Sequence, residues 1–165
     1  MRINVFASKE LQATIVALKT MDRELAKQTR AAVKSVGQPE WQDAVKANVT
    51  TRLESRVLGD TARVAVSDQN VTLKSAAMGK KLSQYGATPS ELAHSAEFGA
   101  DREYVGSTIS PKGKRYTRHT RRQFEARNRK GRVVYPAAAK FIPRMAALYV
   151  QTTVRTLYEA FEKKG

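Results

Sequence analysis

The sequence predicts an α+β fold, with a long N-terminal helix and a C-terminal helix packed on a small central antiparallel β-sheet and a long basic loop. Three observations indicate it: apolar residues recur at helical spacing near both ends, apolar and polar residues alternate over 62–75, and positive charge gathers in one later segment. With 165 residues, 41% of them hydrophobic, the chain is sized for one core. We therefore expect a single domain over residues 1–165, with an extended basic arm at about 106–132.

The first half of the chain changes from a helical period to a period of two. Residues 3–5 predict a short edge strand, and a helix is expected over 8–36 because its apolar residues fall near one face. Gly37 is suited to end this helix, and Pro39 to begin a second, short one. Alternation around a polar turn then predicts a β-hairpin over 62–75.

The following segments are less regular. Residues 52–58 and 91–98 are each open between strand and helix, and the turn formers of 79–90 predict a loop. Residues 133–135 predict a short strand. Prolines at 136 and 143 predict a bend, with the second proline opening a last helix that reaches about residue 163.

The most unusual feature is a run of positive charge between Pro111 and Arg132. It holds ten basic residues and one acid, Glu125, so it supplies +9 of the chain's net charge of +15. It has no apolar period, and its like charges repel, so we expect an extended, solvated loop that becomes ordered on an anionic partner. The candidate partner- or DNA-binding residues are Lys112, Lys114, Arg115, Arg118, Arg121, Arg122, Arg127, Arg129, Lys130 and Arg132.

Composition argues against several classes of protein. There is no cysteine, and no common nucleotide- or metal-binding motif, so we expect no catalytic site, no cofactor and no metal. His94 and Glu97 could act as base and acid in a hydrolase, but no nucleophile or metal set accompanies them. No apolar run approaches the roughly 18 residues of a membrane span, so we expect a soluble, cytoplasmic protein.

The residues leave two interpretations of the arm open. As a nucleic-acid element, its arginines would pair with phosphates while Tyr116, His119 and Phe124 stack on bases. As an assembly element, the same arginines would bind carboxylates of a neighbouring subunit, with Phe124 as an anchor.

Two short motifs carry a resemblance to a known family. Ala96-Glu97-Phe98-Gly99 resembles the EFG signature of the tail-component family of long-tailed (siphovirus) phages, which includes tail-to-head joining and tail-completion proteins of the neck. The run from Tyr135 to Arg144 is similar to the proline-and-aromatic start of that family's last helix. Two departures are Ala100, where the family usually has threonine, and a longer, more basic excursion between the motifs.

The resemblance implies a structural protein of the virion neck or tail, with no catalysis, assembled in the host cytoplasm. Such proteins form rings, commonly of six copies, between the head connector or adaptor and the tail tube, and their role can be tail-to-head joining, tail completion or tail termination. The implied partners are further copies of the chain, connector and tail-tube proteins, and possible DNA in the lumen, with no membrane. The implied interface anchors are Glu97, Phe98, Phe124 and Phe141. A stand-alone basic nucleic-acid-binding protein is the alternative.

Overall fold

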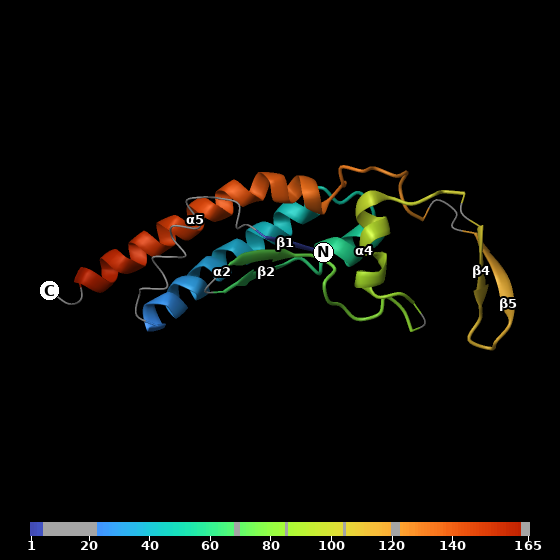
Figure 1. Ribbon diagram of the computed structural model, residues 1–165, viewed down its shortest axis with the longest axis horizontal. Coiled ribbons are helices and arrows are strands. Elements are labelled where there is room, and N and C mark those ends of the chain that lie inside the picture. Colours follow the sequence, from blue (N-terminus) through green and yellow to red (C-terminus); the bar gives the residue numbers. More distant parts are fainter. Residues whose placement is uncertain (5–22, 68–69, 85, 104, 120–122, 163–165) are drawn as a thin grey trace.

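The computed structural model describes residues 1–4, 23–67, 70–84, 86–103, 105–119 and 123–162. The fold is α+β, as predicted: two long helices lie side by side and pack against a small antiparallel sheet (Figure 1). A shorter helix, α4 (Pro89–Phe98), lies beyond one end of this pair. A second, two-stranded sheet stands still farther out along the same axis, so the molecule is elongated.

Helix α2 (Arg23–Lys46) runs without interruption through the positions expected to break it. The predicted helix end at Gly37 and the second helix beginning at Pro39 are therefore wrong, while the helix over 23–36 is confirmed and the rest of the predicted span lies outside the described residues. Tertiary packing explains the difference, because a Cβ added to Gly37 would lie 2.9 Å from Met145 Sδ of α5. The glycine lets the two helices approach closely instead of ending one of them.

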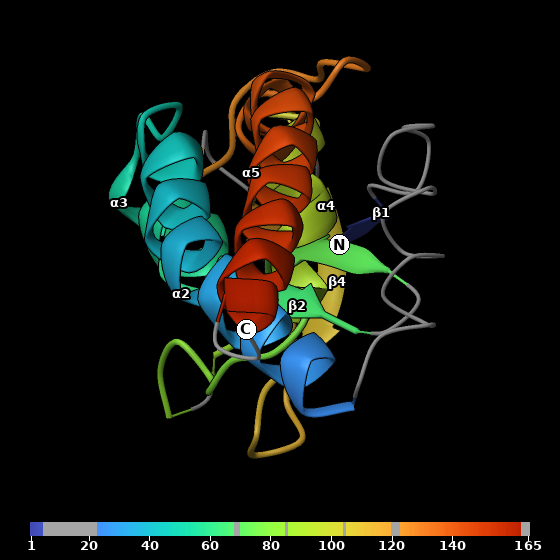
Figure 2. The same ribbon diagram turned by 90° about the vertical axis from the view of Figure 1, so that its left-hand side faces the viewer.

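The core lies between α2, α5 (Val134–Glu162) and the sheet, and Figure 2 shows the two helices side by side, foreshortened along the long axis of the molecule. Trp41 is fully buried and its ring centroid lies 5.5 Å from that of Phe141. Its indole Nε1 donates a hydrogen bond of 3.1 Å to the carbonyl oxygen of Lys74, so one side chain joins both helices to the sheet. Val33, Val45 and Met145 are also fully buried between these elements.

The main sheet has the strand order β1-β3-β2, with all neighbours antiparallel. β2 (Arg63–Val66) and β3 (Val71–Lys74) form the predicted hairpin, which is confirmed. β1 (Arg2–Asn4) is the expected edge strand, and it pairs Ile3 with Leu73. On the opposite edge the side chain of Gln38 accepts from Val64 N at 2.8 Å and donates to Ala62 O at 3.0 Å, so it occupies backbone groups that another strand could use.

Both segments left open between strand and helix are helical. Residues 52–58 form α3 (Arg52–Glu54) and the π-helical turn η1 (Ser55–Gly59), and residues 91–98 belong to α4. Each begins with a capping box, Thr51 with Glu54 and Thr88 with Glu91. This spacing, a threonine three residues before a glutamate, is a local signal that favours a helix start over a strand.

The C-terminal helix begins earlier than expected. The predicted strand at 133–135 and the bend between the prolines are wrong, because α5 is continuous from Val134 and includes both Pro136 and Pro143. Pro136 lies in the first turn, where a backbone N–H has no partner within the helix in any case. A carboxylate from α4, that of Glu97, holds the first turn in place.

A clamped basic β-hairpin as the candidate binding surface

The buried side chain of Glu97 organises the centre of the molecule. This residue is 0% exposed, and its carboxylate accepts hydrogen bonds from the backbone N–H groups of four consecutive residues, from Arg132 to Tyr135. The shortest of these bonds are 2.7 Å from Val134 N and 3.0 Å from Tyr135 N. These amides form the start of α5, where unpaired donors and the positive end of the helix dipole favour an anion. Glu97 thus fixes the start of α5 to the end of α4.

Two backbone hydrogen bonds, which together we call the clamp, join the chain where it leaves the body, at Phe98 and Ala100, to the place where it returns, at Glu125 and Asn128. Ala100 N donates to Glu125 O at 3.0 Å, and Asn128 N donates to Phe98 O at 2.8 Å. Gly99 between them has φ of +74°, and a Cβ there would lie 2.3 Å from Ala126 O. Only glycine combines this backbone conformation with so close an approach of another chain segment. The clamp therefore requires a glycine after Phe98.

The segment between the two ends of the clamp contains a second β-hairpin. Its strands are β4 (Val105–Ile109) and β5 (Arg115–His119), paired antiparallel from Val105 with His119 to Ile109 with Arg115. A turn joins them, in which Gly113 has φ of +76° and Ser110 N donates to Lys114 O at 2.8 Å. The expectation of an extended loop is wrong for these residues, because ladder hydrogen bonds and β-forming side chains outweigh the like-charge repulsion.

The hairpin exposes apolar as well as basic side chains. Val105 and Ile109 are 55% and 63% exposed, and both lie on one face because they are four residues apart on a strand. Tyr116, opposite Thr108 on the other face, is 48% exposed. Figure 1 shows the hairpin well away from the helices. A lone two-stranded hairpin with exposed apolar residues is marginally stable in water, so it is suited to pack against a partner.

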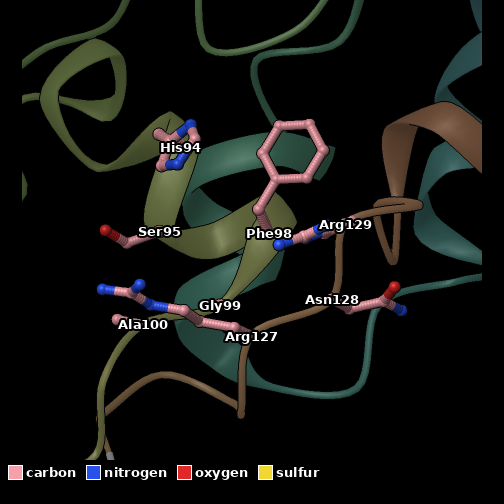
Figure 3. Close-up of a pocket in the computed structure, with 8 residues that line it drawn as sticks. All are labelled: His94, Ser95, Phe98, Gly99, Ala100, Arg127, Asn128 and Arg129. Carbon is pink, nitrogen blue, oxygen red and sulfur yellow. The ribbon is translucent and has the colours of Figure 1, made fainter.

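A pocket of about 560 Å³ lies at the root of the hairpin. Figure 3 shows its lining, which comes from the end of α4 and from the chain returning from the hairpin: His94, Ser95, Phe98, Gly99, Ala100, Arg127, Asn128 and Arg129. The rings of His94 and Phe98 have centroids 5.0 Å apart, and Phe98 and Tyr135 are 5.4 Å apart. The root therefore presents a row of aromatic rings beside two arginines.

The structure distributes the predicted arm residues over two places. Lys112, Lys114 and Arg115 are exposed at the tip of the hairpin, and Arg118 lies in β5. Arg127, Arg129 and Lys130 are exposed at the root, next to the half-buried Arg132. Arg121 and Arg122 lie outside the described residues. Arg102, which precedes the arm, forms an ion pair with Glu125 across the clamp.

The predicted anchors do not all lie at the surface. Glu97 and Phe141 are buried inside the subunit's own fold, so in this chain they position neighbouring segments and expose no contact surface. Phe98 and Phe124 are half-buried. The carboxylate of Glu97 is committed to backbone amides, which gives no support to its pairing with His94 as an acid. The sequence reasoning missed Val105 and Ile109, because Ser107 holds the position between them on the same face and interrupts the apolar alternation of a strand.

Within the described ranges, no three or more His, Cys, Asp or Glu side chains gather as metal ligands would. No helix in the same part of the chain is both long and apolar enough to span a bilayer. No protein-family model, curated protein sequence or solved structure matches this chain.

Proposed function

We propose that the protein is a non-enzymatic structural component of a phage virion neck, acting in tail-to-head joining, tail completion or tail termination. In this proposal it assembles into a ring, with six copies as the expected number, between the head connector and the tail tube. The chain is produced in the host cytoplasm and ends in the virion. The sequence resemblance suggests this class, and the geometry of the EFG residues supports it.

The observation that carries the proposal is the clamp. Glu97, Phe98 and Gly99 each have a separate task in fixing the root of a projecting hairpin to the body. A subunit that projects a fixed arm from one end of an elongated body is suited to reach across a boundary between neighbouring subunits. An enzyme would instead need reactive groups gathered in a cleft. The root pocket contains His94, but the buried carboxylate of Glu97 accepts hydrogen bonds from backbone amides.

Assembly of the chain into a ring tests this proposal. The purified full chain is examined by native mass spectrometry, alone and mixed with the head-connector and tail-tube proteins encoded with it, and the products are imaged by electron microscopy. We expect a closed ring, formed by the chain alone or on contact with one of these proteins. A strict monomer that joins neither protein would refute the proposal.

The alternative, a stand-alone nucleic-acid-binding protein, is favoured by the net charge of +15 and by the exposed cations at the hairpin tip. It predicts binding to duplex DNA. The logarithm of the association constant should fall linearly with the logarithm of salt concentration, with a slope set by the number of phosphates neutralised. Replacing Lys112, Lys114 and Arg115 with alanine should flatten that slope. Absence of duplex binding at low salt would dismiss this alternative.

A further inference from the structure

We infer that the face of the hairpin bearing Val105 and Ile109, together with the root pocket, is a docking surface for an acidic protein other than this chain. This inference rests on the proposed function, since it states which contact the arm makes within the neck.

The cations at the root are available to a partner. Arg102 is paired with Glu125 within the clamp, whereas Arg127 and Arg129 have no ion pair among the described residues and their side chains are exposed. In Figure 3 both line the pocket beside the row formed by His94 and Phe98. Arginine and aromatic residues are enriched where protein interfaces concentrate their binding energy. The guanidinium groups fit carboxylates of the partner, and the exposed edges of the rings offer apolar contact.

The apolar side chains favour a protein over a nucleic acid. Val105 and Ile109 are more than half exposed on one face of the hairpin, and aliphatic groups gain free energy by leaving water. A phosphate backbone offers them no apolar surface, whereas a protein groove does. Arg115 pairs with Ile109 in the β-ladder, so a basic side chain shares the face with the two apolar ones. Apolar contact combined with cations is typical of a protein interface whose partner carries acidic residues.

The charge of the chain argues against a second copy as the occupant. A second copy would bring a net charge of +15 to a surface that already carries exposed arginines, so contacts between copies in the ring are expected on other faces of the chain. Most carboxylates in the described part of the chain already have partners within it, through backbone amides, threonine or basic side chains: Glu40, Glu54, Asp60, Glu91, Glu97, Glu125 and Glu159. Few remain to receive the arginines of a neighbour. The occupant is therefore a different, acidic protein, such as the adjoining ring of the neck.

The experiment measures binding of the full chain to the purified head-connector and tail-tube proteins by surface immobilisation or calorimetry. Two double variants probe the surface, Arg127→Ala with Arg129→Ala at the root and Val105→Ser with Ile109→Ser on the hairpin. A matched control replaces two exposed lysines elsewhere, Lys80 and Lys140, with alanine. All four side chains probed are exposed, so thermal melting should confirm that the variants fold.

We expect each surface variant to weaken binding to one of the two proteins by about tenfold or more, and the lysine control to change it little. A short DNA duplex at physiological salt should not displace that protein. The inference is overturned if the wild-type chain binds neither protein, if both variants bind as the wild type does, or if duplex DNA competes and only the arginine variant matters. Ring formation by the same wild-type preparation tests the proposed function separately, so the two failures are distinguishable.

Discussion

Replacement of Glu97 with glutamine tests whether the buried carboxylate holds the molecule together. Glutamine has the same shape, but one of its two terminal atoms is a donor. If the amide nitrogen takes the position of Oε2, the bond of 2.7 Å from Val134 N is lost and two N–H groups face each other. If it takes the position of Oε1, the bonds from Arg132 N and Tyr135 N are lost instead. Either orientation leaves at least one buried donor without an acceptor.

The expected loss of stability can be worked out from these lost hydrogen bonds. A hydrogen bond to a charged group contributes about 1.5–3 kcal/mol, and an unsatisfied buried donor costs about 1–3 kcal/mol. Neutral glutamine is easier to bury than a carboxylate, which offsets part of the sum. We therefore expect Glu97→Gln to lower the free energy of unfolding by about 3 kcal/mol. For a chain of this length each kcal/mol lowers the melting temperature by roughly 2–4 °C, so the shift should be roughly 6–12 °C.

The assay is thermal and urea unfolding followed by circular dichroism. The matched control is Glu103→Gln, because this exposed carboxylate has no hydrogen-bond partner in the described ranges. The control should melt as the wild type does. If Glu97→Gln also melts within about 2 °C of the wild type, the carboxylate does not secure the start of α5 and the reasoning about the clamp is wrong.

Four further predictions concern the clamp, the core and the hairpin. Gly99→Ala should destabilise the fold by about 2 kcal/mol or more in urea unfolding, because of its positive φ and its contact with Ala126 O; wild-type stability would contradict this. Tyr149→Phe should not lower stability, since the buried hydroxyl has no partner among the described residues; a clear loss would disprove it. Burial raises the pKa of Tyr149 above its ordinary 10.0, so wild-type stability should fall as the pH rises beyond that value, and the loss should be smaller in Tyr149→Phe. Replacing residues 103–123 with a short glycine-serine linker should leave the melting temperature nearly unchanged while removing partner binding; a large drop would show that the hairpin supports the body.

The elements that could be predicted are those with one buried face. In β3 buried and half-buried residues alternate, and the main hairpin was predicted correctly from that period. In β4 exposed and half-buried residues alternate instead, so the hydrophobic pattern is weak and the charge of the segment dominates the prediction. Glycine and proline were misleading in the helices, because the contact of Gly37 with Met145 involves residues distant in sequence.

The location of the candidate site could be predicted from the sequence, but the hydrogen bonds that hold it together could not. The basic arm and the EFG residues were both identified from the sequence, yet Glu97 was expected at an interface. Its hydrogen-bond donors follow 35 to 38 residues later in the chain, so no local pattern reveals that they meet. The same holds for the clamp, in which Phe98 and Ala100 bind backbone groups beyond the hairpin.

The clamp also explains how a residue that never touches a partner can influence binding. A two-stranded hairpin alone is marginally stable, and ordering it on contact would reduce affinity. The hydrogen bonds from Ala100 N to Glu125 O and from Asn128 N to Phe98 O hold its two ends together before any partner arrives, and Glu97 fixes the segment that follows. Loosening Glu97 should therefore weaken docking as well as stability, whereas Val105→Ser with Ile109→Ser should weaken docking alone. This contrast separates residues that position the surface from residues that form it.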